Sequence, residues 1–103
     1  ALMMQLTGQM IDAQEALRIG LVNQVVPPAE LLPAAERLAA SIAEKSPNAV
    51  RLTLEAVIHG PEMALDDAMR YEADLFGLAC STEDIDEGIA AFLEKRKPAF
   101  KGR

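Results

Sequence analysis

Residues 46–80 read "SPNAVRLTLEAVIHGPEMALDDAMRYEADLFGLAC", and this stretch decides the fold. Ser46 and Pro47 predict a helix start, because proline is well tolerated in the first helical turn. Gly60 and Pro61 interrupt the pattern. On either side of that break, apolar residues recur at helical spacing: Val50, Leu54, Val57 and Ile58 before it, and Leu65, Met69, Leu75 and Phe76 after it. The stretch therefore predicts two amphipathic helices, of which the second covers about residues 62–78.

The same period continues on both sides of this pair. A helix of about fourteen residues is predicted after Ala29, and another begins at Ser81 or Thr82 and stops before Pro98. Their apolar stripes are Leu31, Ala35, Leu38 and Ile42 in the first, and Ile85, Ile89, Phe92 and Leu93 in the second. Four amphipathic helices with short connections predict an all-α unit over residues 29–103.

Residues 1–28 have a different pattern. Asp12 is placed to cap a short helix in a capping box with Glu15, and Gly20 supplies a left-handed residue after it. The β-branched segment 21–26 predicts one short strand, which either stays an extended loop or pairs with a sheet outside these residues. The chain also opens inside an apolar helical segment without a cap residue, so we expect it to be the end of a longer one.

Composition narrows the class of protein. Half of the 103 residues are apolar and the formal net charge is −6, which is typical of an ordinary globular domain. Cys80 is the only cysteine, so an intrachain disulfide and a zinc cluster are excluded, and we expect a small buried apolar side chain there. Neither a membrane span nor a signal segment is evident, and this favours a cytoplasmic location without a membrane partner.

Candidate catalytic or metal-binding groups do not converge in this sequence. His59, the only histidine, suits the end of a helix structurally. Glu72 falls within an apolar stripe and would need a partner, such as an arginine, if it were buried. Carboxylates at the starts of the last two helices complement the helix dipole better than they predict a metal site: Asp66, Asp67, Glu83, Asp84, Asp86 and Glu87.

The carboxyl end is the most unusual feature. Five of the ten Lys and Arg residues lie in the last nine positions: Lys95, Arg96, Lys97, Lys101 and Arg103. They could complement the end of the last helix, or hold a small polyanion with Phe92 stacking on a purine ring. The acidic remainder of the chain argues against nucleic acid as a partner.

Three segments together carry a resemblance to a known family. They read "MMQLTGQMIDAQEALRIGLVNQVVP", "SPNAVRL" and "EGIAAFLEKRKPAFKGR". The chain resembles, from end to end, the C-terminal part of the enoyl-CoA hydratase/isomerase, or crotonase, family. The resemblance implies that residues 1–28 finish a core of β-β-α turns and that residues 29–103 form a small helical domain. It also implies a homo-oligomer, either a trimer or a hexamer.

The resemblance further implies that the parent protein is an enoyl-CoA hydratase of the fatty acid β-oxidation type, which adds water to 2-enoyl-CoA. Alternatives are an isomerase or another acyl-CoA lyase of the family, or a free-standing, non-catalytic helical assembly module. The family's oxyanion hole and catalytic glutamates precede these residues, so no catalytic residue is assigned and the fragment alone is expected to be inactive. No metal or prosthetic group is implied. Phe76, Phe92 and Lys95 match residues that contact the adenine and 3′-phosphate end of the CoA substrate.

Overall fold

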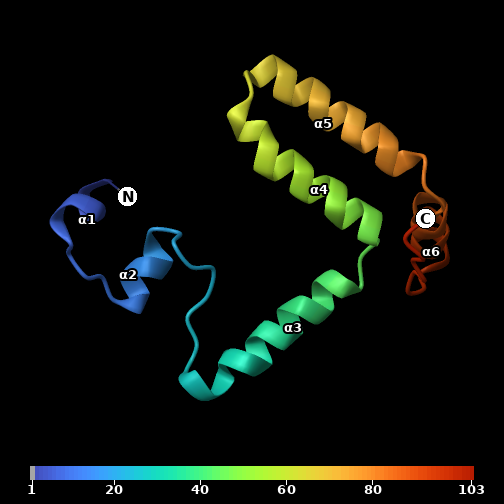
Figure 1. Ribbon diagram of the computed structural model, residues 1–103. Coiled ribbons are helices and arrows are strands. Elements are labelled where there is room, and N and C mark those ends of the chain that lie inside the picture. Colours follow the sequence, from blue (N-terminus) through green and yellow to red (C-terminus); the bar gives the residue numbers. More distant parts are fainter. Residues whose placement is uncertain (1) are drawn as a thin grey trace. The chain divides into compact units, whose positions relative to one another are not determined.

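The computed structural model describes residues 2–103 and contains only helical secondary structure in that range (Figure 1). Two 3₁₀ turns, η1 (Pro28–Glu30) and η2 (Gly60–Glu62), interrupt the α-helices. The helices are α1 (Leu2–Thr7), α2 (Ala13–Arg18), α3 (Leu31–Ala43), α4 (Pro47–His59), α5 (Leu65–Cys80) and α6 (Glu83–Glu94). The all-α prediction is confirmed. The helices belong to two compact units, one ending at Glu36 and the other spanning Arg37–Arg103.

The first unit contains the predicted cap of α2. The Asp12 carboxylate accepts the Glu15 backbone N–H at 2.7 Å, but the Glu15 carboxylate pairs with Arg18 instead of completing the box. Gly20 has a φ of +75°, as its place after the helix requires.

The predicted strand at 21–26 does not form, since this segment consists of bends and irregular backbone. The Leu21 and Val22 N–H groups donate to the Ala16 carbonyl, and residues 2–103 contain no strand with which the segment could pair. Within residues 2–103 the segment is therefore a loop, and its pairing with a sheet outside these residues stays a prediction.

The second unit is built on a helical hairpin. Helices α4 and α5 lie side by side and antiparallel, joined through η2 (Figure 1). Leu52 and Leu75 are buried in the hairpin, and the Tyr71 hydroxyl approaches the Glu55 carboxylate at 3.5 Å. Helix α5 starts three residues later and ends two residues later than the sequence predicts, whereas the Ser46–Pro47 start of α4 is confirmed.

Most of the predicted apolar stripes are not covered. Of the four stripe residues in α5, only Leu75 is buried, and Phe76 is 69% exposed. Other apolar residues of the helices stay exposed too: Leu31, Leu38, Ile42, Leu54, Val57, Ile58, Leu65, Met69, Ile89, Phe92 and Leu93. The helices are therefore amphipathic as predicted, but their apolar faces lack a packing partner within the described residues. None of the helices in residues 2–103 is long and apolar enough to cross a membrane.

Cys80 departs from the expectation of a buried side chain. It is a free thiol at the last position of α5, and it is exposed. The last turn of this helix contributes little to the small core, which explains the difference.

Candidate functional site

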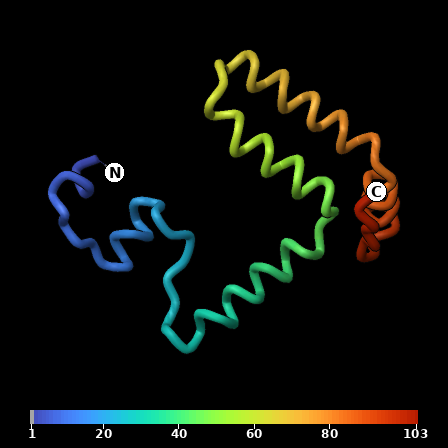
Figure 2. Tube along the Cα trace, viewed as in Figure 1, coloured from blue at the N-terminus to red at the C-terminus, as the bar shows by residue number. Residues whose placement is uncertain are grey.

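The basic carboxyl end folds back along α6 (Figure 2). The reversal begins at Lys95, whose backbone is left-handed, with φ 54° and ψ 39°. Its N–H donates to the Phe92 carbonyl, and the Arg96 N–H donates to the Ala91 carbonyl. These two bonds form a Schellman motif, in which the left-handed position is usually glycine. A lysine occupies that position here.

Asp84, in the first turn of α6, holds the end of the returning segment. The residue is 3% exposed, and its carboxylate accepts the Ser46 hydroxyl at 2.6 Å, the Lys101 N–H at 2.7 Å and the Gly102 N–H at 3.0 Å. These hydrogen bonds, with that of Ser46 first in importance, lower the pKa of the Asp84 carboxyl. The Asp84 N–H also donates to the carbonyl of Arg103. One carboxylate therefore joins α4, α6 and the chain end.

Glu87, one turn further along α6, holds the first part of the returning segment. Its two oxygens accept the Arg96 guanidinium at 2.6 and 2.9 Å, and one of them also accepts the Ala99 N–H at 2.6 Å. The Arg96 hydrogen bond is the main cause that lowers the pKa of Glu87 to about 2. Arg96 is held on its other side by the Glu94 carboxylate at 2.6 Å. We refer to Asp84 and Glu87 with these donors as the tail anchor.

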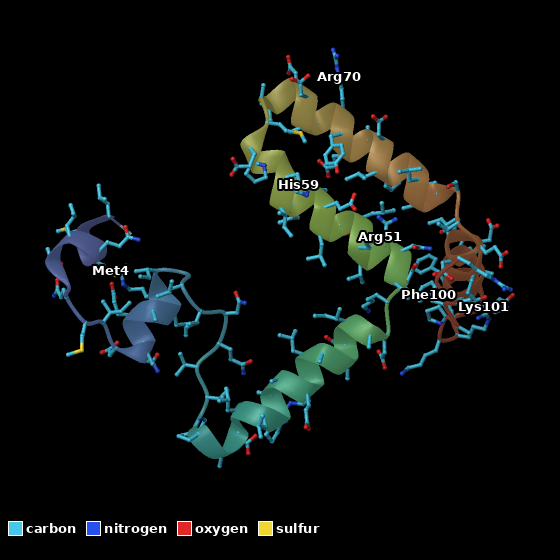
Figure 3. All side chains as sticks on the ribbon, viewed as in Figure 1. Met4, Arg51, His59, Arg70, Phe100 and Lys101 are labelled. Atoms are coloured by element: carbon cyan, nitrogen blue, oxygen red, sulfur yellow. The ribbon has the colours of Figure 1, made fainter. Side chains whose placement is uncertain are left out.

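Two glycines give the returning segment room. A Cβ at Gly88 would lie 3.5 Å from the Phe100 ring, which packs there against α6. Gly102 has a φ of +72° and approaches the Pro47 ring. Figure 3 shows Phe100 and Lys101 beside α6, near the start of α4. The segment is thus packed as well as hydrogen-bonded.

The five basic residues differ in their partners. Arg96 pairs with Glu87 and Glu94, Lys97 pairs with Glu44 at 3.1 Å, and Arg103 pairs with Glu83 at 2.9 Å. The charge of Lys101 acts on Glu87, although the two form no ion pair. Within residues 2–103, the Lys95 ammonium has no hydrogen bond or ion pair. Lys95 and Lys101 are therefore the tail cations without an ion pair in this part of the chain, and only Lys101 acts electrostatically on a tail-anchor carboxylate.

The three predicted contact residues lie on two helices and the turn that follows. Phe76 is on α5, Phe92 is in the last turn of α6 and is 83% exposed, and Lys95 is at the Schellman turn. Phe92 and Lys95 are one helical turn apart in sequence. Phe76 lines a different feature, a groove of about 590 Å³ between α4 and α5.

This α4–α5 groove is mainly apolar. Its lining includes Leu52, Val57, Met69, Phe76 and Ile85. Glu72 also lines it. That carboxylate is exposed, so the partner expected for a buried glutamate is not required, and it has no hydrogen bond or ion pair within residues 2–103.

The other candidate residues considered from the sequence are His59 and the acidic side chains at the helix starts. His59 is exposed in the last turn of α4, the kind of helix end at which the sequence predicts it (Figure 3). Among residues 2–103, no cluster of three or more His, Cys, Asp or Glu side chains is arranged to hold a metal ion. Asp84 and Glu87 are engaged by the tail.

The chain matches a known family over its whole length. Residues 1–103 match the family model described as enoyl-CoA hydratase/isomerase. The chain belongs to this family. The resemblance inferred from the three sequence segments is thereby confirmed, and the described helices are a portion of the crotonase fold.

Relatives in the enoyl-CoA hydratase/isomerase family are much longer. The crotonyl-CoA hydratase of Syntrophomonas wolfei is 51% identical over 91% of this chain and 36% of its own length. The short-chain-enoyl-CoA hydratase of Clostridium acetobutylicum is 46% identical over 94% of this chain and 38% of its own length. A crystal structure of an enoyl-CoA hydratase from Geobacillus kaustophilus matches with a TM-score of 0.89 and 45% identity. The match covers 94% of this chain and 37% of the Geobacillus chain. The chain spans between a third and two fifths of these relatives.

The tail anchor is the feature of this family member that sequence reasoning missed. Asp84 and Glu87 were interpreted only as complements to the helix dipole. A signal was available, because two carboxylates three residues apart precede a basic segment that contains Pro98 and Gly102. Proline and glycine favour a chain reversal over a free end.

Proposed function

We propose that this chain forms part of an enoyl-CoA hydratase that adds water across the double bond of a 2-enoyl-CoA thioester. The observation that carries the proposal is the 51% identity to a crotonyl-CoA hydratase over 91% of the chain. The reaction would be of the fatty acid β-oxidation type. The substrate is an acyl-CoA, and no prosthetic group is required.

Within that enzyme, residues 1–28 would complete the core and residues 29–103 would form the helical domain. The uncovered apolar faces support the assignment of these residues to part of a larger enzyme, because exposed stripes of this size normally pack on a partner surface. The partner is either the rest of the enzyme or a second subunit in a trimer or hexamer. We expect the full-length enzyme in the cytoplasmic fraction of the cell. Its sedimentation should give the mass of a trimer or a hexamer.

The contribution of this portion is to bind the nucleotide end of CoA. Lys95 has no acidic partner among residues 2–103 and would contact the 3′-phosphate, and Phe92, one turn earlier, would stack against the adenine. Phe76 would supply further apolar contact. The portion supplies no catalytic residue, and the 103-residue chain alone would not hydrate its substrate.

The test uses a full-length form, meaning a protein of the relatives' length that contains these residues. Hydration of crotonyl-CoA, monitored by loss of the absorbance of the conjugated enoyl thioester, tests the reaction. Conversion of a 3-enoyl-CoA to the 2-enoyl-CoA without hydration of crotonyl-CoA would instead identify an isomerase. Lys95→Ala should weaken CoA-thioester binding, whereas Lys101→Ala serves as the matched control. Equal and negligible effects of both changes would remove the role of Lys95.

A further inference from the structure

The left-handed backbone at Lys95 is unusual for its residue type. Within residues 2–103 it is the only non-glycine residue with a positive φ. The other three left-handed positions, Gly8, Gly20 and Gly102, are glycines. A side chain with a Cβ is strained in this conformation, and glycine would adopt it without strain. Such strain persists only where the surrounding structure enforces it.

The tail anchor enforces this conformation from the side that follows Lys95. Arg96 is fixed by three hydrogen bonds, two to Glu87 and one to Glu94. Glu87 also accepts the N–H of Ala99, so one carboxylate holds the chain at two points beyond Lys95. The backbone at 95 therefore cannot relax without breaking ionic hydrogen bonds at 96 and 99.

We propose that Glu87, acting through Arg96, is a positioning residue that holds Lys95 in its strained conformation. The lysine at this position binds an anion, and its strained backbone makes the protein less stable than a glycine there would. This inference rests on the proposed function, since the anion is the 3′-phosphate of the CoA substrate. The arrangement separates two tasks: Arg96 is neutralised by glutamates and shapes the turn, and Lys95 keeps its charge for the ligand.

Substitution of Lys95 tests the strain and the charge separately. In the full-length form, Lys95→Gly should raise Tm by about 2 °C, because glycine relieves the left-handed strain. Lys95→Ala should bring no such gain, because alanine is strained there as lysine is. The preference for the 3′-phosphate is measured as the ratio of KM for crotonyl-3′-dephospho-CoA to KM for crotonyl-CoA. Both changes should reduce this ratio by up to roughly fivefold. An unchanged or lower Tm for Lys95→Gly would overturn the claim that the lysine at this position lowers the stability of the protein.

Substitution of Glu87 tests the positioning role. Glu87→Gln, with Arg96→Gln as a second variant, should reduce the same preference by roughly two- to threefold. The change should appear in KM more than in kcat. Glu83→Gln is the matched control, because it removes the Arg103 ion pair from the same helix without touching the Lys95 turn.

The outcomes separate this inference from the proposed function. If Lys95→Ala leaves the preference for the 3′-phosphate unchanged, the CoA role of Lys95 fails, whatever the Tm of Lys95→Gly. If Lys95→Ala removes the preference but Glu87→Gln and Arg96→Gln only lower Tm, the binding role stands and the positioning role is overturned. A merely structural Glu87 would move Tm without moving the ratio of the two KM values.

Discussion

The Ser46 hydroxyl donates to the Asp84 carboxylate at 2.6 Å, across 38 positions of sequence. The same hydroxyl oxygen accepts the Ala49 N–H at 3.4 Å and so caps α4. Asp84 in turn holds the N–H groups of Lys101 and Gly102. The start of α4, the start of α6 and the end of the chain are thus joined through two small polar side chains, both buried.

Replacing Ser46 by alanine should destabilise the chain by about 1 to 2 kcal/mol, because the α4 cap is lost together with the hydrogen bond to Asp84. Thermal unfolding followed by circular dichroism measures the change. Ser41→Ala is the control, since Ser41 is exposed and donates only to the Leu38 carbonyl. Equal stability of the two variants would contradict the structural role of the Ser46–Asp84 bond.

The tail anchor should weaken in acid. The pKa of Glu87 is lowered from 4.5 to about 2, mainly by the Arg96 guanidinium, and that of Asp84 is lowered, mainly by the Ser46 hydroxyl. Because both folded-state pKa values lie below the unfolded ones, the stabilisation is complete above about pH 4.5 and is lost as pH falls toward 2. The protection factors of the Ala99 and Gly102 amides, taken against the intrinsic exchange rate at each pH, should fall across this window before those within α4 do.

The variant Glu87→Gln provides the control for acid sensitivity. Without an ionisable group at position 87, the protection factor of the Ala99 amide should already be low at pH 6 and should change little on acidification. If Ala99 and Gly102 in the unsubstituted chain stay protected at pH 2, the carboxylates do not hold the tail in the manner described.

Gly88 should accept alanine and reject a larger side chain. A Cβ there meets the Phe100 ring at 3.5 Å, an ordinary contact, and alanine favours the helix interior over glycine by about 0.8 to 1 kcal/mol. Gly88→Ala should therefore raise the free energy of unfolding by up to that amount. Gly88→Leu should displace the Phe100 ring and lower Tm. Chemical denaturation of both variants checks the pair, and a stabilising leucine would show that Phe100 does not pack there.

The 103-residue chain should bind a hydrophobic dye or self-associate, because its apolar faces are uncovered. Phe76→Ser and Phe92→Ser should each reduce dye fluorescence, since both rings are mostly exposed. Arg51→Ser is a control on the polar surface of α4 (Figure 3). A stable monomer without dye binding would contradict the exposure of these faces.

The helices of this chain were predictable because their signals are local. Ser46 and Pro47 start α4 as expected, Gly60 and Pro61 end it, and apolar periodicity marks α5 and α6. The burial of the stripes was not predictable in the same way. Periodicity shows which face of a helix is apolar, but covering Met69 or Phe76 needs a surface that the described residues do not provide.

The candidate site was predictable only in part. The concentration of positive charge was visible in the sequence, but charge alone could not distinguish Lys95 from Arg96 or Lys97. That distinction depends on contacts between distant residues, such as Arg96 with Glu87 and Lys97 with Glu44. The left-handed turn was hidden for another reason, because a lysine stands where the usual signal would be glycine.

The exposed thiol at the end of α5 makes this chain convenient for spectroscopy. Cys80 is the only cysteine, so a maleimide probe would attach at one place without any substitution. Tyr71 is the only tyrosine, and tryptophan is absent. Tyr71 and Cys80 lie roughly 13 Å apart along the axis of α5. Helix α5 therefore carries a unique intrinsic fluorophore and a unique attachment point, and a label at Cys80 would report when a partner surface closes over the hairpin.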